Sequence, residues 1–75
     1  MKEDIKFDYR KLRGRIVEVD GNITSFCKRT GMNRSSVCHK LVDGRSMRQD
    51  EILNYADALG IGDYEYKTYF FTVLS

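Results

Sequence analysis

The chain is 75 residues long and has a formal net charge of +2, with 41% hydrophobic and 32% charged residues. This composition is typical of a folded domain, and the length suffices for one domain with a small core. So short a chain cannot also enclose a deep substrate cavity, so we expect a surface-binding protein and not an enzyme. The chain shows no apolar run of secretory or membrane-spanning character, which predicts a cytoplasmic protein with no membrane partner.

The charge is unevenly distributed along the chain. The segment Arg10–Arg48 contains ten Lys or Arg against three acidic residues, a local net charge of +7. Residues 49–75 have a net charge of −4 and contain many aromatic side chains. This asymmetry favours one face for polyanionic DNA and another face for a different partner.

The chain contains no proline, and glycines mark the boundaries between the expected helices. The first helix is expected over Tyr9–Val19, with Asp8 as its N-cap. Its buried face should comprise Leu12, Ile16 and Val19, and its outer face Arg10, Lys11, Arg13 and Arg15. Gly14 costs roughly 1 kcal/mol relative to alanine inside a helix, which indicates close packing against another backbone or a weak spot.

Two shorter helices are expected on either side of Gly31. Asn22 caps the first of them, and Asn33 immediately precedes the second, which should end at Leu41 or Val42. The apolar face of the first comprises Ile23, Phe26 and Cys27, whereas Lys28 and Arg29 should point to water. The second has Val37 and Leu41 as core contacts, so its remaining polar face is free to bind.

A fourth helix and an aromatic tail complete the expected fold. Ser46 and Gln49 have the spacing of a capping box, and the helix should end at Gly60. Its apolar stripe comprises Ile52, Leu53, Ala56 and Leu59. Beyond Asp63 we expect a short helical turn followed by an extended tail.

The segment Ile23–Leu41 meets the requirements of a helix-turn-helix. Two helices that meet steeply need a small residue in the first helix and a glycine in the turn, and Cys27 and Gly31 have the appropriate spacing of four. The second helix is anchored from below by Met32, Val37 and Leu41. Its N-terminal turn is then free to enter the major groove of DNA.

The stretch from Phe26-Cys-Lys-Arg-Thr-Gly to Arg34-Ser-Ser-Val-Cys-His-Lys-Leu, followed by Gly44, resembles the Cro and repressor family of phage helix-turn-helix regulators. The flanks Phe7-Asp-Tyr-Arg-Lys-Leu and Tyr69-Phe-Phe-Thr extend the resemblance to nearly the whole chain. Two positions depart from it, because Cys27 replaces the usual alanine and Lys40 stands at a common apolar position. The resemblance implies an all-α bundle of four or five helices forming a single domain over residues 1–75, with a short flexible N-terminus at residues 1–6.

The resemblance also implies the roles of individual residues. The residues expected to read DNA bases are Asn33, Arg34, Ser35, Ser36 and His39. The residues expected to contact DNA phosphates are Asn22, Thr24, Lys40, Arg45 and Arg48. The aromatic residues Tyr66, Tyr69, Phe70 and Phe71 either cover the core or form a dimer or partner interface.

The two cysteines and the single histidine do not indicate a metal site or a catalytic site. Cys27, Cys38 and His39 are too few for a zinc site, so we expect no metal, cofactor or small-molecule substrate, and no structural disulfide. The function expected is that of a sequence-specific transcription regulator that binds a double-stranded DNA operator as a homodimer. The alternative is an antirepressor that binds a repressor protein and modulates its DNA binding. The first function should depend on Arg34, and the second on Tyr69 or Phe70.

Overall fold

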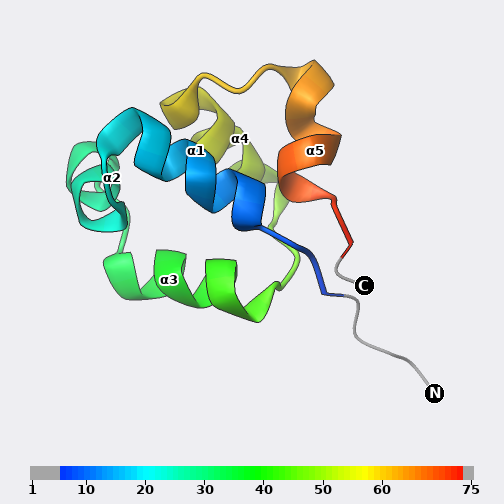
Figure 1. Cartoon of the computed structure of the whole chain (residues 1–75), viewed down its shortest axis with the longest axis horizontal. Coiled ribbons are helices and arrows are strands. Elements are labelled where there is room, and N and C mark those ends of the chain that lie inside the picture. Colours follow the sequence, from blue (N-terminus) through cyan, green and yellow to red (C-terminus); the bar gives the residue numbers. More distant parts are fainter. Residues whose placement is uncertain (1–5, 74–75) are drawn as a thin grey trace.

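The computed structural model describes residues 6–73, and this part of the chain is all-α, as expected. Its elements in chain order are α1 (Arg10–Asp20), α2 (Ile23–Thr30), α3 (Arg34–Asp43), α4 (Gln49–Leu59), the 3-10 turn η1 (Asp63–Glu65) and α5 (Tyr66–Phe70). Figure 1 shows α1 crossing the middle of the molecule, with α3 along one side and α4 and α5 on the opposite side. The expected flexible N-terminus, apart from Lys6, lies outside the described residues.

Asparagine and glycine set the ends of α2 and α3. Asn22 Oδ1 accepts a hydrogen bond from the Ser25 N–H at 2.7 Å, and Asn33 Oδ1 accepts one from the Ser36 N–H at 3.0 Å. Both helices end in the left-handed conformation at glycine, so the orphan carbonyls of the last turn are satisfied. The two predicted starts are confirmed, and α3 extends one residue beyond Val42.

The start of α4 differs from the expected capping box. The Glu51 carboxylate accepts the Arg48 N–H at 2.9 Å, and the helix begins at Gln49, so Ser46 is not its cap. The Tyr9 hydroxyl donates to the Arg45 carbonyl oxygen at 2.6 Å and holds the preceding loop against α1. This long-range contact fixes the loop path, which a local pattern of residues does not reveal.

The core is built around stacked aromatic rings. Phe26 of α2 stacks on Tyr55 of α4 with 5.7 Å between ring centroids, and Tyr55 also meets Phe70 of α5 at 6.5 Å. The buried hydrophobic residues are Tyr9, Leu12, Ile16, Phe26, Cys27, Val37, Met47, Ile52, Tyr55, Ala56, Leu59, Ile61 and Phe70. Every helix contributes to this list, so a single core joins all of them.

Two residues expected in the core are on the surface. Val19 is 44% exposed because it lies in the last turn of α1, beyond the buried positions of that helix. Leu53 is 50% exposed because it lies about 100° around α4 from Ile52. Tyr55 occupies the buried stripe of α4 in its place.

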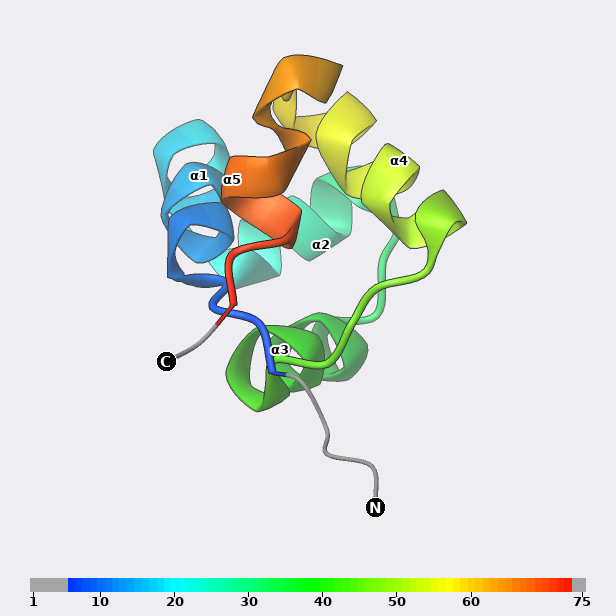
Figure 2. The same cartoon turned by 90° about the vertical axis from the view of Figure 1, so that its right-hand side faces the viewer.

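The first and last segments that the structure describes pair near the end of α3. Phe7 and Val73 form an isolated antiparallel bridge, and the Asp8 N–H donates to the Thr72 carbonyl oxygen at 2.7 Å. The Phe7 N–H donates to the Gly44 carbonyl oxygen at 2.8 Å, which ties the same segment to the end of α3. Figures 1 and 2 show the blue and red ends of the ribbon running next to each other there. The expected short helical turn corresponds to η1 and α5, and of the expected extended tail the structure describes residues 71–73, which end in this bridge.

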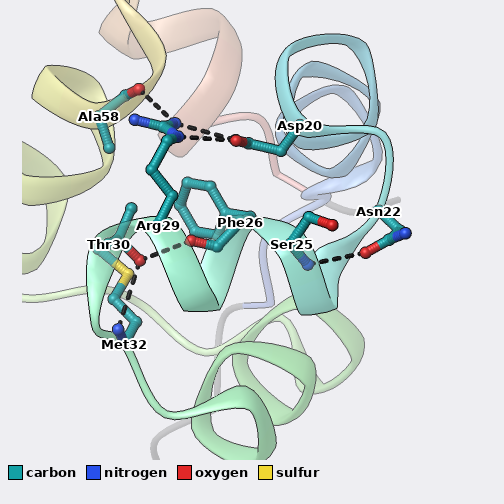
Figure 3. A network of polar contacts seen from close by, with 8 residues as sticks. All are labelled: Asp20, Asn22, Ser25, Phe26, Arg29, Thr30, Met32 and Ala58. Atoms are coloured by element: carbon teal, nitrogen blue, oxygen red, sulfur yellow. Dashed lines mark hydrogen bonds and ion pairs between the residues drawn. The ribbon is translucent and has the colours of Figure 1, made fainter.

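Two arginines expected to face water hold helices together instead. Figure 3 shows Arg29 of α2 reaching Asp20 at the end of α1 and the Ala58 carbonyl oxygen of α4, at 2.7 and 2.8 Å. Arg15 of α1 donates from Nε and Nη2 to the Leu59 carbonyl oxygen at 3.1 and 3.0 Å. Both guanidinium groups thus satisfy carbonyl groups at the negative end of the α4 dipole.

Candidate functional site

The exposed start of α3 gathers the side chains expected to read DNA bases. Asn33, Arg34, Ser35, Ser36 and His39 are all exposed, whereas Val37 beneath them is buried. Arg34 Nε donates to the Thr24 hydroxyl of α2 at 3.0 Å, so the structure joins an expected base reader to an expected phosphate contact. Asn33 Oδ1 is already occupied as the cap of α3.

The expected phosphate-binding cations are paired with carboxylates of the same protein. Lys40 Nζ lies 2.9 Å from Glu51 Oε2, Arg48 Nη2 lies 3.2 Å from Asp50 Oδ2, and Arg45 Nε lies 3.7 Å from Asp43 Oδ2. Asn22, the remaining expected phosphate contact, caps α2. The segment 40–51 has three cations and three carboxylates, so its formal net charge is zero.

The Lys40–Glu51 pair is the most sheltered of the three, because its side chains are 28% and 25% exposed. Burial raises the pKa of Glu51, but hydrogen bonds from the Arg48 N–H and Lys40 outweigh this effect, and the net shift of the pKa is downward. Glu51 is therefore ionised at neutral pH and neutralises Lys40. Counting cations along the sequence missed these partners, because the pairing carboxylates lie mainly at the start of α4.

The four aromatic residues expected at a dimer or partner interface have different environments. Phe70 is only 1% exposed and packs against Tyr55 and Tyr66, so it belongs to the core and is not available to a partner. Tyr66 and Tyr69 are half-buried. Phe71 is 47% exposed and meets the Phe7 ring edge-on. Of the four residues, Phe71 is thus the one most open to a partner.

An open apolar groove lies between α4 and the C-terminal segment, with a volume of about 390 Å³. It is lined by Met47, Gln49, Ile52, Leu53, Tyr66 and Phe71. Of these residues, Leu53 is 50% exposed and Phe71 is 47% exposed. Large apolar side chains exposed together commonly mark a binding surface. The sequence interpretation missed the contribution of Leu53, because it assigned this residue to the core.

Within residues 6–73, no three His, Cys, Asp or Glu side chains lie close enough together to hold a metal ion. Cys27 is buried and Cys38 is half-buried, and both are free thiols. Burial raises the pKa of the Cys27 thiol, which disfavours the reactive thiolate. No helix in this part of the chain is long and apolar enough to cross a membrane.

Residues 5–73 match the model of a family described as "Protein of unknown function (DUF739)". The chain belongs to this family. The DUF739 member is also similar to the solution structure of the modulator of repression (MOR) of the temperate bacteriophage TP901-1 from Lactococcus lactis. The TM-score is 0.74 at 32% identity, over 88% of this chain and 89% of that one. No curated protein matches.

These similarities confirm the coarser part of the resemblance inferred from sequence. The DUF739 chain is related to a small phage protein that is a modulator of repression. The narrower assignment to Cro-type or repressor-type DNA-binding proteins remains a prediction, and so do the roles given to individual residues of α3.

Proposed function

We propose that this DUF739 protein is a phage-type modulator of repression, which binds a repressor protein in the host cytoplasm and alters its binding to operator DNA. The observation that carries the proposal is the similarity in sequence and fold to MOR over 88% of the chain. This function is the antirepressor alternative inferred from the sequence. It needs a surface for a protein partner and requires no catalytic group.

The groove between α4 and the C-terminal segment supports a role in protein binding. Leu53 and Phe71 line it and remain substantially exposed, with the buried Met47 and Ile52 also in its wall. A few residues near the centre of a protein interface carry most of its binding energy, and aromatic anchors that fill pockets are typical among them. We therefore assign the repressor contact to this groove.

The proposed function can be tested with a repressor from the same phage or prophage and its labelled operator. Fluorescence anisotropy would follow the repressor–operator complex while the DUF739 protein is added. We expect the apparent operator affinity of the repressor to change with the concentration of added protein, and a direct complex of the two proteins by calorimetry. An unchanged operator isotherm and no calorimetric heat would contradict the proposal.

Substitutions in the groove test where the repressor binds. Phe71→Ala and Leu53→Ala should each weaken the protein complex about tenfold, or about 1.4 kcal/mol, because each removes an exposed apolar anchor. Tyr64→Ala and Val42→Ala are matched controls, because both residues are more exposed than Phe71 and Leu53 and neither lines the groove. Equal weakening by the control pair would argue against this groove.

Direct reading of DNA is the second candidate function, and the exposed polar start of α3 favours it. Arg34 is held against Thr24 at this point, where its guanidinium is accessible. If the protein alone recognises an operator, Arg34→Ala should remove its preference for that site over mixed-sequence DNA, while the repressor complex persists. Sedimentation with and without the operator would test the expected homodimer in the same samples.

A further inference from the structure

The positive charges of segment 40–51, from the second half of α3 to the start of α4, are balanced by carboxylates. Segment 40–51 spans the end of the basic part of the sequence and the start of the acidic part, and its three cations each lie within ion-pair distance of a carboxylate. Because the three carboxylates belong to the same short segment, its net charge is zero even when an exposed pair opens. A DNA backbone approaching this segment would meet no excess of positive charge.

The Lys40–Glu51 pair lies beside the exposed start of α3. Lys40 and Glu51 line a groove of about 260 Å³ between α3 and α4, together with Asn33 and Ser36 from the beginning of α3. Glu51 is fixed there because its Oε1 accepts the Arg48 N–H while its Oε2 meets Lys40. The neutralising carboxylate is thus part of the helix start and is not a freely moving side chain.

We propose that Asp43, Asp50 and Glu51 are specificity-determining residues that keep nucleic acid off the surface formed by segment 40–51. Sequence-independent DNA affinity comes mainly from cations that replace the counterions of phosphates, and a cation already paired within the protein contributes little of it. Specificity is a difference of affinities, so suppressing the affinity for DNA favours a protein partner without adding any contact to that partner. This inference goes beyond the proposed function, because it is measured on DNA without a repressor.

The test removes two carboxylates without changing the size of their side chains. Asp43→Asn with Glu51→Gln leaves Lys40 and Arg45 without their anionic partners, while the Gln oxygen can still accept the Arg48 N–H. Binding to a labelled mixed-sequence DNA duplex would be measured by anisotropy at about 50 mM and about 200 mM salt. We expect the variant to bind measurably more tightly than the natural protein at low salt. Between the two salt concentrations, the affinity of the variant should fall by about tenfold more than that of the natural protein. This is the effect of roughly two further phosphate contacts.

A second double variant provides the same change of charge elsewhere. Asp57→Asn with Asp63→Asn also adds two units of charge, but both residues are exposed, and neither pairs with a cation among residues 6–73. This control should gain far less DNA affinity. Equal gains by the two double variants, or no gain by the first, would overturn the proposal, as would tight salt-dependent binding by the natural protein.

Circular dichroism would establish that each variant is folded. If Glu51→Gln disturbs α4, Asp43→Asn with Asp50→Asn provides the same test, because it frees Arg45 and Arg48 and leaves the Glu51 cap in place. Binding of the repressor by these variants is a separate measurement. Its loss or absence would bear on the proposed function and not on the exclusion of DNA.

Discussion

Asp8 stabilises the start of α1 although Tyr9 occupies the cap position. Its carboxylate accepts the Arg10 N–H at 3.0 Å and pairs with the Arg10 guanidinium at 2.7 Å. Hydrogen bonds from the Arg10 side chain and then from its backbone lower the pKa of Asp8 from 3.8 to about 2. Because the folded pKa lies below the unfolded value, the ionised carboxylate stabilises the fold above about pH 4, and this contribution is lost as the pH falls towards about 2.

Asp8→Asn should therefore make stability less dependent on pH in this acid range. The measurement is the thermal midpoint at a series of pH values from about 5 to about 2. We expect the variant to be less stable than the natural protein at the upper end, with the difference narrowing towards the lower end. Asp57→Asn is the control at an exposed position, and a constant difference for Asp8→Asn at every pH would refute this role of its charge.

Gly44 is the glycine whose neighbours most restrict substitution. It has a φ of +71°, and a Cβ built on it would lie 2.6 Å from the Phe7 carbonyl oxygen. Gly31 has a similar φ of +77° but nothing within 4 Å of such a Cβ. Gly31→Ala should cost about 1 kcal/mol from the left-handed conformation alone, and Gly44→Ala about 1–2 kcal/mol more. Urea unfolding of both variants would measure the difference, and equal losses would show that the Phe7 contact carries no strain.

At the scale of elements, Gly14 is the weak position of α1. It lies within the helix, is exposed, and has nothing within 4 Å of a built Cβ. Of the two explanations inferred from the sequence, the close packing against another backbone is therefore wrong, and the weak spot stands. Gly14→Ala should stabilise the protein by about 1 kcal/mol, since alanine has the higher helix propensity. A rise of a few degrees in the thermal midpoint would be expected, and a fall would contradict it.

The ends of helices were predictable where the signal is local. Asn22 and Asn33 were predicted as helix starts because an asparagine side chain reaches the backbone three residues later, whatever the rest of the fold does. The start of α4 was mispredicted because the spacing of three fits both Ser46–Gln49 and Arg48–Glu51. The choice between them depends on how the preceding loop packs, which includes the hydrogen bond from Tyr9 to Arg45.

The roles of the charged side chains were less predictable, because their partners are distant in sequence. Arg15 reaches a carbonyl oxygen 44 residues away, and Arg29 reaches one 29 residues away. No periodicity along a helix distinguishes such an arginine from one that faces solvent. The same limitation affected the candidate site, where Lys40 is neutralised by Glu51 of another helix. The exposure of the start of α3 was predictable from the sequence. The pairing of the neighbouring cation Lys40 with a carboxylate was not.

In the molecule as a whole, two adjacent aromatic residues separate the core from the groove proposed to bind the repressor. Phe70 is 1% exposed and closes the core, whereas Phe71 is 47% exposed beside the groove. A chain of this length has a total stability of only about 4–11 kcal/mol. Removing a buried phenylalanine costs about 3–5 kcal/mol, so Phe70→Ala should remove a large part of this stability and lower the thermal midpoint sharply.

Phe71→Ala should instead cost less than about 1 kcal/mol of stability, because half of the ring is already in water. Both substitutions replace a phenylalanine by alanine, at adjacent positions. Comparing them therefore distinguishes an effect on folding from an effect on repressor binding. Urea unfolding and calorimetry with the repressor should show a stable Phe71→Ala protein with weak binding. A Phe70→Ala protein, where its folded fraction is recovered at low temperature or with a stabilising osmolyte, should still bind. If Phe71→Ala is stable and binds normally, the partner contacts another face and the groove is only a feature of packing.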